Sequence, residues 1–224
     1  MSTDTTITLD TVDDVTFLAV APVPTEWGVF DCHAFRGPDG VEHLAFSRGD
    51  LTGDEPVTVR VHSECLTGDV FGSRRCDCGP QLAAAMRLVA DLDRGVVVYL
   101  RGHEGRGIGI GSKISAYELQ DRGLDTVDAN LELGLPVDTR EYGAAGRILT
   151  HLGLRQIRLV TNNPATVVGL SAMGMHVVER VALPLHVTPE NERYLRTKRD
   201  RMGHRLPESI TSAPVFATIE GKTA

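Results

Sequence analysis

The chain has 224 residues, 42% of them hydrophobic and 24% charged, which is ordinary for a globular protein with one large core or two small ones. Its formal net charge of −7 argues against nucleic acid as the main partner, because contact with a phosphate backbone needs a basic surface. No apolar run approaches the roughly 20 residues of a membrane helix, and the chain does not begin with a basic segment followed by an apolar one. We therefore expect a cytoplasmic protein with neither a membrane nor a nucleic-acid partner.

The first part of the chain predicts β-structure. Residues 1–11 are rich in Thr and Asp without periodicity, so we expect a frayed tail there. Short alternating or apolar segments follow, separated by turns of Pro, Gly and Asp, and they predict an antiparallel meander. Its strands are expected at Val15–Val20, Gly28–Phe35, Glu42–Ser47 and Pro56–Val61.

From Leu82 onward the pattern alternates between helix and strand, which predicts a mixed α/β fold around one core. Helices are expected at Gly79–Asp93, at Lys113–Asp121, at Tyr142–Leu152 and after Asn162-Asn-Pro164, strands at Gly95–Leu100, Ile157–Thr161 and His176–Val181, and a polar loop at Asp125–Asn130. We expect one domain over residues 12–204, with tails at 1–11 and 205–224.

The segment 191–204 is highly charged and is expected to form a short helix. We interpret its Glu192, Lys198, Arg199 and Arg201 as a solvated helical face rather than a site. The composition beyond it predicts disorder.

Three of the four cysteines lie in one turn-rich segment and indicate a metal site. Ten residues separate Cys65 from Cys76, and one separates Cys76 from Cys78. Three protein ligands would leave a fourth position open for chemistry, whereas a fourth ligand from His62 or Glu64 would make the site structural. Reduced packing cysteines or a disulfide with a spare thiol are the alternatives, which the polar surroundings and the one-residue spacing disfavour. The remaining Cys32 is interpreted as a small buried residue.

Two further segments carry candidate chemistry. The loop from Arg101 to Gly111 contains five glycines between a strand and a helix, so it is either a phosphate-binding loop or a tight turn. Within it, a Glu104 carboxylate can accept hydrogen bonds from a guanine edge, and an Arg106 guanidinium can bind phosphate oxygens. Asp138 and Arg140 point the same way if their segment is extended, which suits proton transfer with charge stabilisation; a surface ion pair is the alternative.

Several motifs in order resemble GTP cyclohydrolase II over roughly residues 15–204. The motifs are Arg60-Val-His-Ser-Glu-Cys-Leu-Thr-Gly-Asp69, Arg75-Cys-Asp-Cys-Gly-Pro-Gln81, His103-Glu-Gly-Arg-Gly-Ile-Gly109, Lys113-Ile-Ser-Ala-Tyr-Glu-Leu-Gln-Asp121, Asp125-Thr-Val-Asp-Ala-Asn130, Thr161-Asn-Asn-Pro164 and Asn191-Glu-Arg-Tyr-Leu195. The form with His103 is similar to the cyclohydrolase half of bifunctional actinobacterial-type riboflavin enzymes.

The resemblance implies a zinc-dependent enzyme of riboflavin biosynthesis that opens the imidazole ring of GTP. The products would be formate, pyrophosphate and 2,5-diamino-6-ribosylamino-4(3H)-pyrimidinone 5′-phosphate. The resemblance also implies a homodimer, one Zn²⁺ per subunit and Mg²⁺ with the triphosphate. The implied zinc ligands are Cys65, Cys76 and Cys78, and the implied GTP contacts are Arg60, Val61, His62, Ser63, Glu64, Gln81, Glu104, Gly105, Arg106, Thr126, Thr161 and Thr166.

The resemblance makes Asp138 the proton acceptor and Arg140 a nucleophile toward the α-phosphate. A protonated guanidinium is a poor nucleophile, so stabilisation of phosphoryl charge is the alternative role for Arg140. The chain departs from the family at Thr166, where a Lys is usual, and the missing charge predicts a raised KM for GTP. The departure leaves open a specialised paralogue that stops at the formamidopyrimidine or takes another nucleotide, or a catalytically silent nucleotide-binding regulator.

Overall fold

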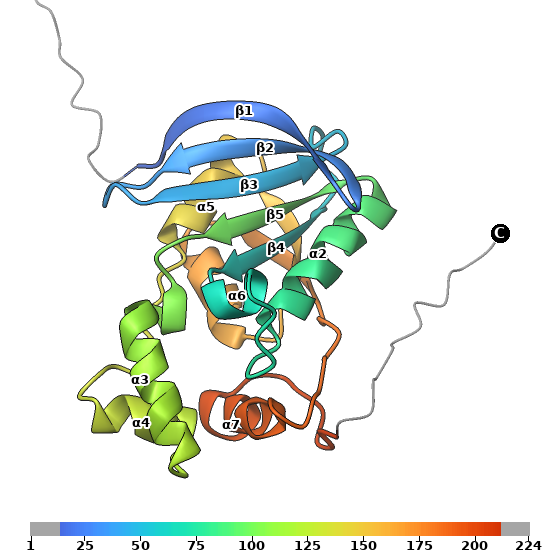
Figure 1. Cartoon of the computed structure of the whole chain (residues 1–224). Coiled ribbons are helices and arrows are strands. Elements are labelled where there is room, and N and C mark those ends of the chain that lie inside the picture. Colours follow the sequence, from blue (N-terminus) through green and yellow to red (C-terminus); the bar gives the residue numbers. More distant parts are fainter. Residues whose placement is uncertain (1–13, 212–224) are drawn as a thin grey trace, which may run out of the picture.

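The computed structural model describes residues 14–211, which form one seven-stranded mixed sheet with helices on both faces (Figure 1). The strands are β1 (Thr16–Thr25), β2 (Gly28–Arg36), β3 (Glu42–Arg48), β4 (Val57–Ser63), β5 (Gly95–Leu100), β6 (Gln156–Val160) and β7 (His176–Val181). Their order in the sheet is β1-β2-β3-β5-β4-β6-β7. The expected α/β class is confirmed, whereas the expected tail at residues 1–11 lies outside the described residues.

The meander is antiparallel only as far as β3, so the expectation that Pro56–Val61 would continue it is wrong. β5 lies between β3 and β4, antiparallel to the first and parallel to the second. The side chains of β4 are buried on both faces, which is typical of a strand covered by helices on both sides. The cysteine loop and the helix after it therefore form a crossover from β4 to β5.

Seven α-helices and one 3₁₀ turn occur in the described part of the chain. They are α1 (Leu66–Asp69), α2 (Cys78–Leu92), η1 (Glu104–Arg106), α3 (Gly109–Asp121), α4 (Thr126–Glu132), α5 (Gly143–His151), α6 (Pro164–Ala172) and α7 (Glu192–Met202). Packing of Met86 and Val89 of α2 against Phe30 and Val97 covers one face of the sheet. The larger core on the other face includes side chains of α5 and α6. No helix among residues 14–211 is long and apolar enough to cross a membrane.

Helices α3, α4 and α7 lie together beyond one end of the sheet (Figure 1). The expected polar loop at Asp125–Asn130 is in fact the start of α4. The Asp125 carboxylate accepts hydrogen bonds from the backbone N–H groups of Val127 and Asp128, at 2.8 and 2.9 Å, and so caps this helix. A segment whose polarity resembles a loop is helical because its first residue is a good N-cap.

Ordered packing continues past residue 204, where a tail was expected. Ile210 is 2% exposed and packs with Leu185, Val187 and Leu195, and Leu206 lies against the same cluster. These apolar residues hold α7 to the preceding extended segment. Residues 212–224 lie outside the described residues.

Candidate active site

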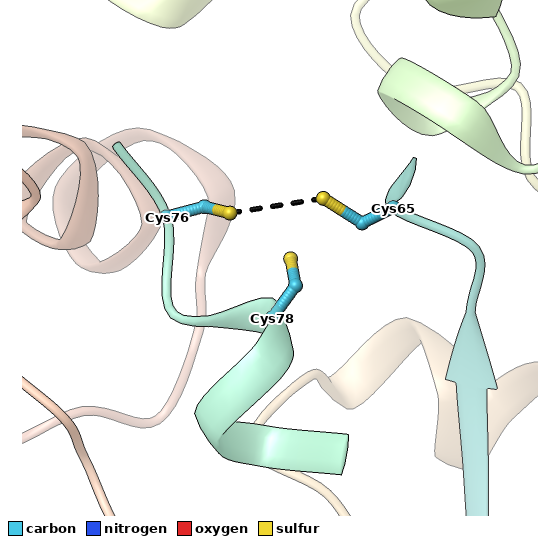
Figure 2. A group of neighbouring side chains, drawn as sticks. All are labelled: Cys65, Cys76 and Cys78. Atoms are coloured by element: carbon cyan, nitrogen blue, oxygen red, sulfur yellow. Dashed lines mark hydrogen bonds between the residues drawn. The ribbon is translucent and has the colours of Figure 1, made fainter. Parts of the chain in front are cut away.

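The three cysteines converge at the end of β4 and the start of α2 (Figure 2). Cys65 follows β4 within two residues, and Cys78 opens α2. The Sγ atoms of Cys65 and Cys76 are 3.7 Å apart, and all three sulfurs lie within 4.8 Å of one another. A Cβ on Gly68 would lie 2.9 Å from Cys76 Sγ and 3.1 Å from Cys65 Sγ, so this position has room only for glycine. The cluster fits a metal site.

In this geometry the Cys65 thiol loses its proton more easily than the other two, because its pKa is lowered and theirs are raised. Donation from the Cys76 and Cys78 thiols lowers the pKa of Cys65, and Lys113 lowers it further. The pKa of Cys76 is raised to about 11, and that of Cys78 is raised well above its usual value, mainly through their bonds to Cys65. A divalent metal that takes all three as thiolates must displace protons, so metal affinity should rise with pH.

Asp69 fixes the backbone of the first cysteine. Its carboxylate accepts hydrogen bonds from the Cys65 backbone N–H at 3.0 Å and from the Tyr99 hydroxyl at 2.9 Å. His62 Nε2 lies 3.0 Å from the same carboxylate. The Glu64 carboxylate accepts instead from the Gly102 N–H at 2.8 Å. In the part of the chain that the structure describes, the metal-capable group at this site comprises only the three cysteines, so neither His62 nor Glu64 joins it.

A cavity opens beside the sulfurs, and many of the residues that line it carry cationic or polar side chains. The predicted site residues that line it are Arg60, Val61, His62, Ser63, Glu64, Cys65, Cys76, Cys78, Gln81, Gly105, Arg106, Thr126, Arg140, Thr161 and Thr166. Within the described part of the chain, its charged lining consists of six Lys or Arg side chains, namely Arg60, Arg75, Arg106, Lys113, Arg140 and Lys198, with Glu64 as the acidic member. An acidic protein thus concentrates positive charge in one cavity, which suits an anionic ligand.

Two predicted site residues, Glu104 and Asp138, do not line the cavity. Each bonds a cation that does. Glu104 accepts from Lys113 Nζ at 2.6 Å, and Asp138 accepts from Arg140 Nε at 2.8 Å. Glu104 also accepts from the Leu66 N–H at 2.6 Å, so its carboxylate is engaged within the protein. The carboxylates act here as supports behind the cationic surface.

Arg106 is held in the glycine-rich loop with its charge unpaired. It is 8% exposed, and neither of its Nη atoms has a hydrogen-bond partner among residues 14–211. The turn that holds it places Gly105 and Gly107 at φ values of 60° and 91°, which favour glycine. The backbone N–H of Thr139 donates to the Arg106 carbonyl at 3.1 Å, which ties the loop to the segment between Asp138 and Arg140. The guanidinium lies over the Tyr194 ring, 5.8 Å from its centroid, and two Nη atoms with no hydrogen bond within the described residues indicate a place for an anion.

The pair Asp138 and Arg140 lies in an irregular segment rather than the extended one on which the expectation rested, and the two side chains form an ion pair. Burial alone would lower the pKa of Arg140, but bonding to Asp138 raises it above its usual value. Burial alone would raise the pKa of Asp138, but the bonds from Arg140 lower it. In this geometry Arg140 is a cation and Asp138 is a carboxylate at neutral pH.

The comparisons with known proteins show the family. The model of the family described as GTP cyclohydrolase II matches residues 17–182. The chain belongs to the GTP cyclohydrolase II family. Two relatives bear the name riboflavin biosynthesis protein RibBA. That of Salinispora tropica is 60% identical over 197 residues, covering 88% of this chain and 49% of the relative. That of Mycobacteroides abscessus is 59% identical over 196 residues, covering 85% and 47%.

This GTP cyclohydrolase II family member spans about half the length of these relatives. Among solved structures, one match is RibBX, a two-domain 3,4-dihydroxy-2-butanone 4-phosphate synthase from A. baumannii, with a TM-score of 0.42 and 20% identity. It covers 75% of this chain and 40% of that one. A likeness at this level carries no argument about function.

Several cavity residues of this family member were not singled out from the sequence, and the interpretation of Lys198 as solvated is wrong. Lys198 is 9% exposed, lines the cavity and donates to Asp77 Oδ1 at 2.9 Å. The charged residues of α7 serve two purposes, because Lys198 points into the cavity while Arg199 and Arg201 form ion pairs nearer the surface. Other lining residues that were not predicted as site residues include Arg75, His103, Ile108, Lys113, Ala116, Gln120, Asn130, Tyr142, Asn162, Asn163, Tyr194 and His204. The one available signal was the rarity of lysine, since the chain has only Lys113, Lys198 and Lys222.

Proposed function

We propose that this chain is a zinc-dependent GTP cyclohydrolase II of riboflavin biosynthesis. It opens the imidazole ring of GTP and releases formate, pyrophosphate and 2,5-diamino-6-ribosylamino-4(3H)-pyrimidinone 5′-phosphate. The observation that carries the proposal is that a three-thiolate cluster and a set of buried cations face the same cavity. A cytoplasmic homodimer is part of the proposal and rests on family membership.

One pair of sulfurs in the cluster has the spacing that zinc requires. Tetrahedral coordination with Zn–S distances near 2.3 Å places two sulfurs about 3.8 Å apart. Cys65 and Cys76 already have a separation of 3.7 Å, so these two ligands need little rearrangement. One Zn²⁺ per subunit, bound by three cysteines, would keep a fourth position open. When bound there, zinc supplies Lewis acidity that activates water at neutral pH.

The cationic lining supports a triphosphate ligand. Arg106 has two unpartnered Nη atoms, and Arg60 is held by the Val160 carbonyl at 3.2 Å and by Gln81 Oε1 at 3.0 Å, with its Nε unpaired. A triphosphate with Mg²⁺ would satisfy such donors, since guanidinium groups bind phosphate oxygens in pairs. The predicted contacts Thr126, Thr161 and Thr166 line the same cavity.

Asp138 and Arg140 would divide proton transfer and charge stabilisation between them. A phosphate that draws Arg140 away from Asp138 would remove the bonds that lower the pKa of this carboxylate. Asp138 would then accept a proton more readily. Because the pKa of Arg140 is raised, we assign it to stabilising phosphoryl charge rather than to nucleophilic attack.

The test is to incubate zinc-loaded protein with GTP and Mg²⁺ and to quantify formate, pyrophosphate and the pyrimidine in one sample. Equal amounts of all three support the full reaction. Pyrophosphate with a formylated pyrimidine and no formate would replace it with a reaction that ends at the formamidopyrimidine. No GTP turnover, with other nucleotides tried in parallel, would overturn the proposal in favour of another substrate or a silent regulator.

A further inference from the structure

Lys113 makes the charged contact to the cysteine cluster. Its Nζ lies 3.1 Å from Cys65 Sγ, 2.9 Å from Thr67 Oγ1 and 2.6 Å from Glu104 Oε1, so its three N–H donors are all used. The side chain is buried, at 8% exposure for the residue. Among the contacts of the described residues, it is the one ammonium or guanidinium that donates directly to a cysteine sulfur.

The ammonium is held in place from behind. Glu104 accepts from Lys113 and is itself fixed by the backbone N–H groups of Leu66 and Gly105, at 2.6 and 3.1 Å. Leu66 directly follows the ligand Cys65, and Gly105 belongs to the glycine-rich loop. The Glu104 carboxylate thus connects the cysteine segment with the glycine-rich loop, and it fixes the position of the Lys113 ammonium beside Cys65 Sγ.

The choice of lysine is selective. Lys and Arg together number 23 in the chain, and only three of them are lysines. The two that fall within the described residues, Lys113 and Lys198, are both buried in the cavity wall. A compact ammonium can place three donors around one point, whereas a planar guanidinium spreads its donors over a wider fork. The three partners of Lys113 surround one point.

The net charge of the proposed metal centre explains why a cation beside Cys65 would be useful. Three thiolates and one divalent ion sum to one negative charge, which weakens the ability of the metal to withdraw electrons from a ligand in its open position. A hydrogen bond from a cation draws electron density from the thiolate that accepts it, and so offsets this effect.

We propose that Lys113 is a positioning residue of the metal centre, which orients the Cys65 thiolate and reduces its electron donation to the bound metal. This inference rests on the metal site of the proposed function. Lys113 acts through Cys65, and Glu104 holds Lys113 in place.

Cobalt-loaded protein tests the proposal without a need for turnover. Co²⁺ replaces Zn²⁺ in thiolate sites and shows a sulfur-to-metal charge-transfer band, whose energy falls as the sulfur becomes more electron-rich. Lys113→Met should shift this band to lower energy, and Lys113→Arg should restore it at least in part. Zinc affinity in Lys113→Met, measured by chelator competition, should fall about ten- to a hundredfold, as is usual when an outer partner of a metal ligand is lost.

Two further variants separate this role from a purely structural one. Lys113→Gln keeps a polar side chain of similar length and should shift the band in the same direction, so the test stands even if the Met variant does not fold. Glu104→Gln weakens the anchor but leaves the ammonium beside Cys65, and should shift the band less. An unmoved band in both neutral variants, or an equal shift in Glu104→Gln, would overturn the proposal. Failure of the wild-type protein to bind either metal would instead reject the proposed metal site.

Discussion

The two walls of the cavity differ in how they are built along the chain. The thiolate wall comes from the cysteine loop and the first residue of α2, so Cys65, Cys76 and Cys78 lie close in sequence. The cationic wall brings together Arg60 of β4, Arg106 of η1, Arg140 of an irregular segment and Lys198 of α7. The residues of the first wall are close in the sequence, whereas those of the second are brought together from distant segments by the fold.

The walls are joined where the loop meets α7. Asp77 stands between two of the cysteines, is 1% exposed and bonds both Lys198 and Gln81, at 2.9 and 2.5 Å. Gln81 in turn bonds Arg60 at 3.0 Å. A change in one wall should therefore reach the other through this chain of buried polar groups.

The largest effect is expected from removing a thiolate. Cys76→Ser should lower bound zinc from about one per subunit to near zero, because a hydroxyl is a far weaker zinc ligand than a thiolate. Turnover of GTP should be lost with the metal. Metal analysis after desalting measures this, and Cys32→Ser is the matched control, since Cys32 lies in β2 outside the cluster. Full zinc content in Cys76→Ser would show that the cysteines are not the site.

The next effect concerns the link between the walls. Asp77→Asn or Lys198→Met alone should lower the free energy of unfolding by about 3–5 kcal/mol, because each leaves a buried charge without its partner. The double variant should be less destabilised than the sum of the two single variants. Chemical denaturation of all four proteins gives the coupling. Additive losses would mean that the pair does not connect the walls.

The contrast between the walls also explains how far the sequence could lead. Ligand type and spacing predict Cys65, Cys76 and Cys78 because thiolates close together in a polar loop have few other uses. Lys198 was misjudged because its neighbours Arg199 and Arg201 do face outward, and only the docking of α7 through Leu195 and Ile210 turns one cation inward. Local patterns do not contain that docking.

The sheet shows the same division. The hairpins β1–β2 and β2–β3 follow from local turns and were predicted. The insertion of β5 between β3 and β4 depends on the crossover through α2 and was not. The family resemblance placed Glu104 and Asp138 in the site, but the structure shows which cation each of them supports.

Thr166 tests whether the cationic wall is complete. It is 4% exposed and lines the cavity at the first turn of α6. Thr166→Lys should add a charged hydrogen bond to phosphate and lower the KM for GTP about ten- to a hundredfold, equivalent to roughly 1.5–3 kcal/mol. Steady-state kinetics measures this, with Thr166→Met as a control for side-chain bulk. An unchanged or higher KM in the Lys variant would show that the wall needs no further charge there.

The smallest effect concerns the neutrality of a histidine among these cations. Burial lowers the pKa of His204 to about 4, and Lys198, Arg140 and Arg106 lower it too. An unfolded histidine titrates near 6.5, so between about pH 4 and 6.5 the unfolded state binds more protons and stability rises with pH. Between pH 7 and pH 5 the wild-type protein should therefore lose about 1 kcal/mol through this residue.

His204→Gln isolates that contribution. In chelator, so that metal binding does not contribute, the difference in unfolding free energy between pH 7 and pH 5 should be smaller in His204→Gln than in the wild type. His186→Gln is the control, because His186 is exposed and lies outside the cavity. An equal pH dependence in all three proteins would mean that the cations near His204 do not act on it. In that case the charges of the cationic wall would not affect His204 and would act only on a ligand that enters the cavity.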